Sequence, residues 1–155
     1  MYQQSAFYRV VVLVEVLVVL DDVIGRFAYF SVYQFHKHFI NLSVIFITHN
    51  LGVVANMADR IGVMYAGKIV EYGTAEEVFY DPKHPYTIGL QKSKPTLDSD
   101  SDTLFNIPGN VPNPINMPDH CYFKERCSMC INKCSGDYPG MIQVSPTHYV
   151  ACHLY

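Results

Sequence analysis

The stretch SVIFITHNLGVVA, residues 43–55, carries the clearest pattern in the chain. Residues 44–48 are β-branched or aromatic, which predicts a strand buried on both faces. After the polar pair His49-Asn50, the apolar spacing becomes helical. A histidine between a buried strand and a helix stands where open α/β sheets bind their ligands. His49 is therefore either a ligand-binding residue or a hydrogen-bonded loop histidine.

The residues that follow predict a small α/β unit. Two strands, 61–65 and 68–72, are joined by Ala66-Gly67, a hairpin signal because glycine tolerates positive φ. We expect Gly73 to end the second strand. Thr74-Ala75-Glu76-Glu77 is a capping box that starts a helix reaching about Tyr80, and a further short helix is expected at residues 86–93.

Composition limits the classes of protein that fit. The 155 residues are 50% apolar and 16% charged, which suits one folded core. The net charge is −3 without a block of like charges, so no nucleic-acid partner is expected. The start lacks the basic region of a signal peptide. The apolar run at residues 10–20 contains Glu15 and is shorter than the ~20 residues that cross a bilayer.

The chain divides into three parts. Residues 1–93 form an α/β body, of which residues 1–42 are the least regular; we expect a strand within 9–20 and a helix at 24–39. Residues 94–119 are rich in proline and predict an extended linker. Residues 120–155 form a tail that contains all five cysteines.

The cysteines predict a metal or cluster site rather than a disulfide framework, because their number is odd and no signal peptide precedes them. Four of them are spaced C-x5-C-x6-C-x17-C, and four thiolates suit either a 4Fe–4S cluster or a tetrahedral zinc ion. Cys130 completes a C-x2-C pair with Cys127 that keeps zinc open, and it is either a spare thiol or an alternative ligand. The remaining alternative is a set of reduced structural cysteines. The four predicted ligands are Cys121, Cys127, Cys134 and Cys152.

Three segments in this order resemble the C-terminal half of an ABC transporter ATP-binding subunit, a P-loop NTPase-like domain: IFITHNLGVVA (45–55), ADRI (58–61) and MYAGKIVE (64–71). PKHPYT (82–87) and the cysteine tail HCYFKERC (120–127) resemble the oligopeptide/dipeptide branch. The resemblance extends over residues 43–155. It implies that the tail holds a 4Fe–4S cluster, with zinc as the alternative.

For His49 the resemblance implies the switch histidine, which contacts the γ-phosphate of ATP. The family usually has Asp at the next position, where this chain has Asn50. Residues 10–15 then fall where the family has its Walker B strand, which makes Glu15 the catalytic carboxylate and Asp21 the D-loop aspartate. Val14 stands in place of the magnesium-binding Asp. The alternative for Glu15 is a partly exposed strand residue.

Other family motifs are not found in this sequence: there is no G-x-x-x-x-G-K-[ST] phosphate loop, signature motif or Q-loop. We therefore expect the C-terminal part of a longer ATPase that needs the rest to bind ATP and Mg²⁺. The implied partners are a second ATPase subunit, permease subunits and, indirectly, a substrate-binding protein, at the cytoplasmic face of the membrane. The alternative is a non-catalytic metal-binding module or an inactive remnant.

Overall fold

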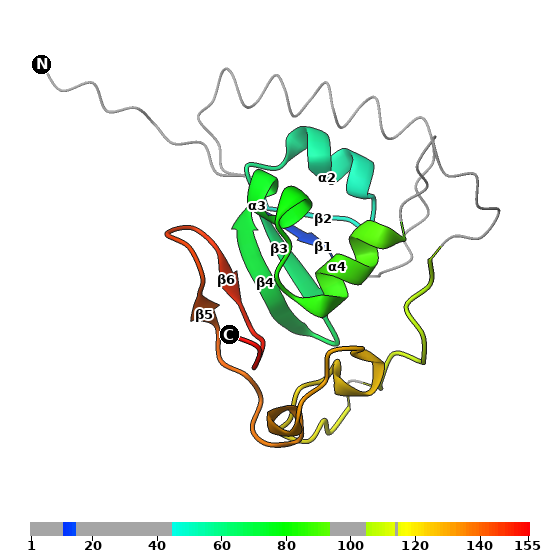
Figure 1. The fold of residues 1–155 in the computed structure, drawn as a ribbon. Coiled ribbons are helices and arrows are strands. Elements are labelled where there is room, and N and C mark those ends of the chain that lie inside the picture. Colours follow the sequence, from blue (N-terminus) through cyan, green and yellow to red (C-terminus); the bar gives the residue numbers. More distant parts are fainter. Residues whose placement is uncertain (1–10, 15–44, 94–104, 114) are drawn as a thin grey trace, which may run out of the picture.

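The computed structural model describes residues 11–14, 45–93, 105–113 and 115–155. The expected α/β class is confirmed (Figure 1). The helix expected at residues 24–39 lies outside the described residues. The elements are β1 (Val11–Val14), β2 (Ile45–Ile47), α2 (Leu51–Met57), β3 (Arg60–Tyr65), β4 (Lys68–Thr74), α3 (Ala75–Tyr80), α4 (Pro85–Lys92), the 3-10 helices η1 (Lys124–Arg126) and η2 (Asn132–Ser135), β5 (Ile142–Gln143) and β6 (Tyr149–Val150).

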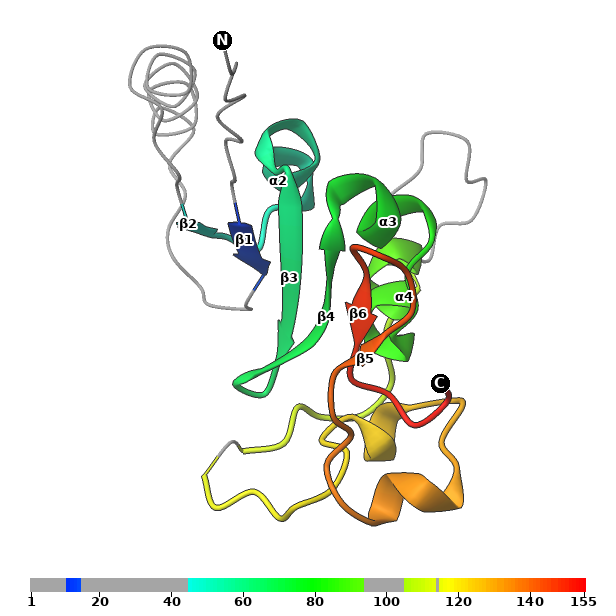
Figure 2. The ribbon, with the colours of Figure 1, turned by 90° about the vertical axis from the view of Figure 1, so that its left-hand side faces the viewer.

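Among the described residues, one sheet holds six strands in the order β2-β1-β3-β4-β6-β5. Strand β1 pairs in parallel with both β2 and β3, and the other pairs are antiparallel. Helices α3 and α4 lie on one face of β3 and β4 (Figures 1 and 2). Because β1, β2 and β3 run in the same direction, their carboxyl ends lie at the same end of the sheet.

The β3–β4 hairpin forms as the sequence predicts. Ala66 and Gly67 both have positive φ, 46° and 79°, as in the two-residue turns whose twist matches that of the strands. The expectation that Gly73 ends the second strand is wrong, because β4 continues through Gly73, which pairs with Ile61. A Cβ atom at Gly73 would lie 3.0 Å from the His148 ring. Glycine is required there by a close contact with the tail.

The prediction for residues 43–48 is wrong in one respect. A strand forms at Ile45–Ile47, but Ile45 and Ile47 are 69% and 57% exposed rather than buried. Strand β2 lies at the edge of the sheet with β1 as its one neighbour among the described strands. Side chains alternate between the two faces of a strand, so Phe46 packs against the core while its neighbours face outward.

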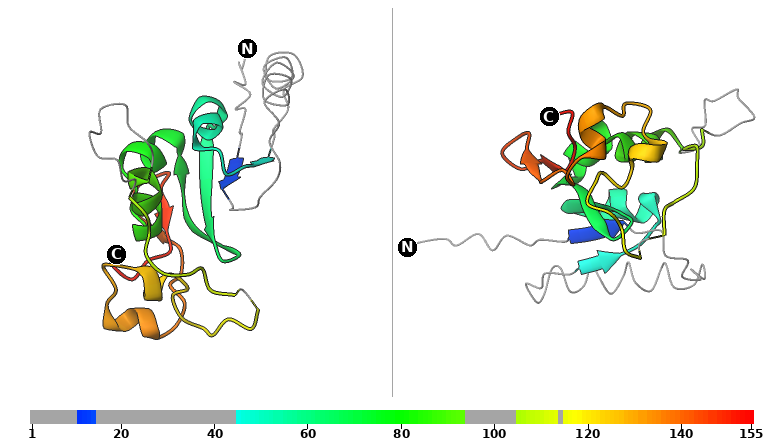
Figure 3. Two further views of the ribbon diagram at one scale, coloured as in Figure 1. Left: turned by 90° about the vertical axis from the view of Figure 1, so that its right-hand side faces the viewer. Right: turned by 90° about the horizontal axis from the view of Figure 1, so that it is seen from below.

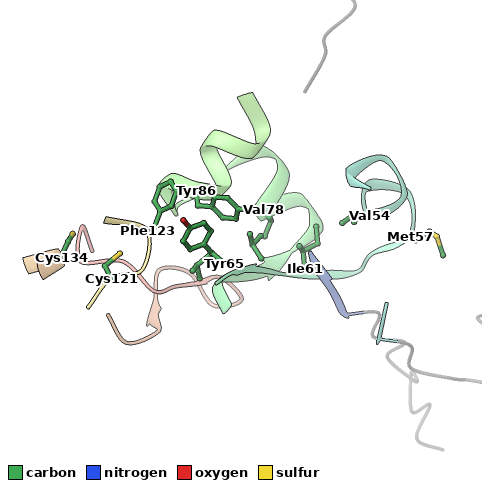
Figure 4. Packing of buried hydrophobic residues seen from close by; sticks show 11 residues of the cluster. Val54, Met57, Ile61, Tyr65, Val78, Tyr86, Cys121, Phe123 and Cys134 are labelled. Carbon is green, nitrogen blue, oxygen red and sulfur yellow. The ribbon is translucent and has the colours of Figure 1, made fainter. Parts of the chain in front are cut away.

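The cysteine-rich tail shares a hydrophobic core with the sheet. Tyr65 from β3, Tyr86 from α4 and Phe123 from the tail form an aromatic group with ring centroids 4.7 to 5.5 Å apart (Figure 4). Phe123 is only 3% exposed. The tail residues before β5 lie beyond the turn of the β3–β4 hairpin, and β5 and β6 return along β4 (Figures 2 and 3).

The described part of the proline-rich stretch, residues 105–113 and 115–119, contains no helix or strand. Arg126 of the tail holds this stretch, because its Nε donates to the Pro108 carbonyl (2.9 Å) and its Nη2 to the Ile107 carbonyl (3.0 Å). The boundaries of the three parts remain predictions. No helix in the described part of the chain is long and apolar enough to cross a membrane.

Candidate functional site

His49 lies in the loop between β2 and α2, and it is exposed. Hydrogen bonds of the adjacent residues Thr48 and Asn50 fix the conformation of this loop. The Asn50 side chain accepts hydrogen bonds from the amides of Gly52 (3.0 Å) and Val53 (3.2 Å), which makes Asn50 the N-cap of α2. Thr48 Oγ1 accepts a hydrogen bond from the Asn50 amide at 3.1 Å. Within the described residues no hydrogen bond of the His49 imidazole is found.

Glu15 and Asp21 lie outside the described residues, so the roles predicted for them remain predictions. Strand β1 ends at Val14, directly before Glu15 in the sequence. Its register with β2 places Leu13 opposite Ile47. The carboxyl end of β1 therefore lies beside the end of β2 that leads into the His49 loop.

A second polar site, which the sequence analysis missed, is built around Glu71 in β4. This carboxylate is fully buried and accepts three hydrogen bonds, from the Lys83 amide (2.6 Å), the His84 amide (3.0 Å) and His148 Nε2 (2.7 Å). His148 is itself 1% exposed. Glu71 thus joins β4, the entry to α4 and the tail. A single glutamate in a strand carries no sequence signal of partners so distant along the chain.

His84 is a buried neutral histidine. Its Nδ1 accepts a hydrogen bond from the Tyr86 amide at 3.1 Å, so the ring serves as the N-cap of α4. Burial lowers the pKa of His84 to about 4, because the charged imidazolium would lose its hydration. It lies two residues before the helix predicted at residues 86–93, but its capping role was not predicted.

Glu77 attaches the tail a second time. Its carboxylate completes the predicted capping box with Thr74, which is confirmed, and also accepts hydrogen bonds from Ser145 Oγ (2.6 Å) and Thr147 Oγ1 (2.7 Å). Burial alone would raise the pKa of Glu77, but the hydrogen bonds from Ser145, Thr74 and Thr147 lower it to about 2. Arg60 Nη2 donates to the Thr147 carbonyl at 2.8 Å.

The tail cysteines differ in exposure. Cys121, Cys134 and Cys152 are buried, Cys127 is half-buried and Cys130 is exposed, and all five are free thiols. Burial raises the pKa values of Cys121, Cys127 and Cys152, and nearby thiols raise them further. Without a bound cation, these groups are therefore protonated thiols rather than thiolates.

The donor chemistry of the tail fits a thiolate-ligated cluster or zinc ion. Burial of Cys121 and Cys134 at one end of the core also suits such a site (Figure 4). However, in the part of the chain that the structure describes, no three histidine, cysteine, aspartate or glutamate side chains are grouped so that they could hold a metal ion. The predicted ligand set of Cys121, Cys127, Cys134 and Cys152 therefore remains a prediction.

Comparison with known proteins bears on the whole C-terminal region. Residues 70–134 match the family model described as "Oligopeptide/dipeptide transporter, C-terminal region". The chain is 54% identical over 116 residues to the oligopeptide transport ATP-binding protein OppD of Bacillus subtilis, and 51% identical over 115 residues to the dipeptide transport ATP-binding protein DppD of Lactococcus lactis. It is 44% identical over 116 residues to OppD of Escherichia coli.

These matches cover 74%, 74% and 75% of this chain but only 32%, 33% and 34% of the relatives, in the order Bacillus, Lactococcus and Escherichia. The chain thus spans about a third of their length. It belongs to the ABC transporter ATP-binding proteins, as their C-terminal part. Within that class it is a member of the oligopeptide/dipeptide branch, as the sequence analysis predicts.

Proposed function

We propose that this chain is the C-terminal part of the ATP-binding subunit of an ABC importer for oligopeptides or dipeptides. The observation that carries the proposal is the exposed residue His49 in the loop that follows the carboxyl end of β2. In the complete P-loop NTPase-like domain the ring donates a hydrogen bond to the γ-phosphate of ATP, while Asn50 fixes the loop by capping α2. A donor positioned before the reaction stabilises the charge that develops during phosphoryl transfer.

Glu15 and Asp21 complete this proposed site. A carboxylate at position 15 polarises the attacking water, and Asp21 contacts the partner subunit's half of the nucleotide site. Mg²⁺ supplies charge neutralisation of the phosphates when it is bound. The Val14 side chain has no oxygen atom to offer this ion.

The proposed partners are a second ATP-binding subunit and the transmembrane permease subunits, with a substrate-binding protein acting through the permease. The proposed location is peripheral, at the cytoplasmic face of the cell membrane. The relatives named as oligopeptide and dipeptide transport ATP-binding proteins support this assignment, as does the match to the transporter family in residues 70–134.

A chimaera tests the function. Residues 43–155 replace the matching region of Bacillus subtilis OppD, and ATP hydrolysis is measured in the assembled transporter. We expect hydrolysis to be retained, and His49→Ala to lower it about 100-fold, the effect of removing one positioned donor. Asn56→Ala is the matched control on α2, because Asn56 is exposed and, among the described residues, its side-chain amide donates to the Gly52 carbonyl alone. A folded chimaera without hydrolysis would contradict the proposed function, and equal rates for the two variants would contradict the role of His49.

The alternative is a non-catalytic module or an inactive remnant, and the absence of a phosphate loop from the sequence favours weak nucleotide binding by this region alone. A titration of the 155-residue chain with ATP measures this affinity. Micromolar binding would show that the region does not need the phosphate loop. A chimaera that folds but neither hydrolyses ATP nor imports peptide would favour the alternative.

We also propose that Cys121, Cys127, Cys134 and Cys152 ligate a 4Fe–4S cluster, with a zinc ion as the alternative. Burial of three of these thiols and their mutual electrostatic influence support the proposal. The role is structural, because the cysteines lie where the tail meets the body. Anaerobic purification should give a brown protein with broad absorbance near ~400 nm, as thiolate-ligated iron–sulfur clusters show. A colourless protein with stoichiometric zinc would replace the cluster by the zinc ion.

A further inference from the structure

A side-chain hydrogen bond spans the backbone of His49. Thr48 Oγ1 accepts from the Asn50 amide at 3.1 Å, and this bond closes a short ring that contains the main chain of the histidine. A threonine hydroxyl bonded to the amide two residues later restricts the backbone angles of the residue between them. Thr48 is half-buried, whereas His49 is exposed. The structure thus fixes the main chain of an exposed residue.

This bond takes the place of one that α2 cannot make within itself. At the start of α3, the amide of the N-cap Thr74 donates to a glutamate carboxylate of the same helix at 2.8 Å, as in a capping box. The N-cap of α2 is Asn50, and three positions later stands Val53, whose side chain has no acceptor. The Asn50 amide donates to Thr48 instead. The cap of α2 is therefore joined to the end of β2, with His49 between them.

The other polar groups of Asn50 are held by α2. Its carbonyl accepts from the Val54 amide at 3.1 Å, and its side chain accepts from the amides of Gly52 and Val53. A Cβ atom at Gly52 would lie 3.3 Å from Asn50 Oδ1, so a side chain there would press on the cap. Strand β2 is held by its parallel pairing with β1. Thr48 therefore links two elements that are each fixed by their own hydrogen bonds.

We propose that Thr48 is a positioning residue for His49. The inference rests on the proposed function, in which the His49 ring donates to the γ-phosphate of ATP. Within the described residues no hydrogen bond of the imidazole is found, so the placement of the ring depends on the backbone from which it extends. Thr48 acts by holding that backbone, not by contact with the nucleotide. A donor that is in place before the reaction stabilises the transition state more than one that must first be reoriented.

The test uses the chimaera with Bacillus subtilis OppD. Thr48→Val removes the acceptor oxygen at nearly constant side-chain size and shape. We expect kcat for ATP hydrolysis to fall about 10-fold, the effect of losing one hydrogen bond, while KM for ATP stays the same. Thr48→Ser keeps the hydroxyl and should keep the rate. Thr87→Val is the matched control, because this threonine is 1% exposed and its hydroxyl has no hydrogen-bond partner in the described part of the chain.

A double variant separates positioning from a general effect on the fold. If Thr48 acts through His49, Thr48→Val should cost no further activity once His49→Ala has removed the ring, because the two changes then share one effect. A loss of the same size in both backgrounds would overturn the proposal. So would a Thr48→Ser variant that is as slow as Thr48→Val, or a Thr87→Val variant that loses as much activity.

Amide hydrogen exchange in the 155-residue chain gives a readout without ATP. The Asn50 amide should exchange about 10-fold faster in Thr48→Val than in the wild type, and Thr48→Ser should restore its protection. If Thr48→Val does not fold, the wild-type chain decides, because an Asn50 amide that exchanges as fast as in an unfolded peptide would refute the inference.

The outcomes also separate this inference from the function on which it rests. A folded wild-type chimaera without hydrolysis contradicts the proposed function and, with it, the role of Thr48. If the wild-type chimaera is active and His49→Ala impairs it while Thr48→Val does not, the function stands and this inference alone fails.

Discussion

At residue scale, the loop around His49 shows what a substitution within a family pattern changes. The usual aspartate after the histidine is Asn50 here, and its side-chain oxygen accepts hydrogen bonds from two amides of α2. Asparagine and aspartate cap helices about equally well. The cap is therefore kept, and the loss of a negative charge beside the imidazole is the one electrostatic difference.

Glu71 should be among the residues most sensitive to substitution. Glu71→Gln leaves a buried amide facing donors that formerly met a carboxylate, so we expect the free energy of unfolding to fall by about 3 kcal/mol. Urea denaturation measures this loss. Glu76→Gln, on the exposed side of α3, is the matched control and should change stability by less than about 0.5 kcal/mol. Similar losses for both variants would contradict the central role of Glu71.

His84 should give the fold a pH dependence. Its folded pKa of about 4 lies below the ordinary value of 6.5, so unfolded chains bind the proton more readily. The stability contribution of neutral His84 is therefore complete above pH 6.5 and is lost as the pH falls from 6.5 towards 4. His84→Asn keeps an N-cap acceptor without this titration. Urea unfolding across that range should show a flatter decline for the variant, and equal slopes would refute the assignment.

At the scale of elements, the β3–β4 hairpin depends on its turn. Gly67 has φ of 79°, and a Cβ atom there would meet no other atom within 4 Å, so backbone strain alone would oppose a side chain. We expect Gly67→Ala to lower the free energy of unfolding by about 1 kcal/mol. Gly140→Ala is the control, because its surroundings are equally open and its φ is not positive. Equal thermal midpoints for the two variants would argue against strain at the turn.

Elements with strong local signals were predictable, and those made by distant contacts were not. The capping box at Thr74, the hairpin turn and the three helices of residues 51–92 follow from residue types within a few positions of one another. Strands β5 and β6 have two residues each, too few for any periodic pattern, and they form because β4 offers an edge. For the same reason the continuation of β4 through Gly73 could not be foreseen.

The residues of the candidate site were likewise predictable only where the sequence signal is local. His49 could be selected from its place between a strand and a helix, and the structure describes it there. Glu71, Glu77 and His148 could not, since their role lies in contacts 68 to 77 residues apart along the chain. The cysteines were visible from spacing, but spacing alone does not distinguish metal ligands from reduced structural cysteines.

At the scale of the whole molecule, body and tail should unfold together, because Phe123 of the tail lies inside the shared core. Phe123→Ala should lower the free energy of unfolding by about 3–4 kcal/mol and leave a single transition. Phe105→Ala, at a ring that is 47% exposed, is the control and should have a much smaller effect. Two separate transitions in the wild-type chain, monitored by fluorescence and circular dichroism, would show that the tail is an independent unit.

The pairing of β4 with β6 has a consequence for the order of folding. Glu71 and His148 are separated by 77 residues, so closing this contact costs more chain entropy than forming the adjacent β3–β4 hairpin. Contacts of such sequence separation form late, and they slow folding. Until β6 arrives, the outer edge of β4 has unpaired backbone groups, which is the kind of edge on which chains aggregate. Refolding yield should therefore fall with protein concentration, chiefly during this last and slowest phase.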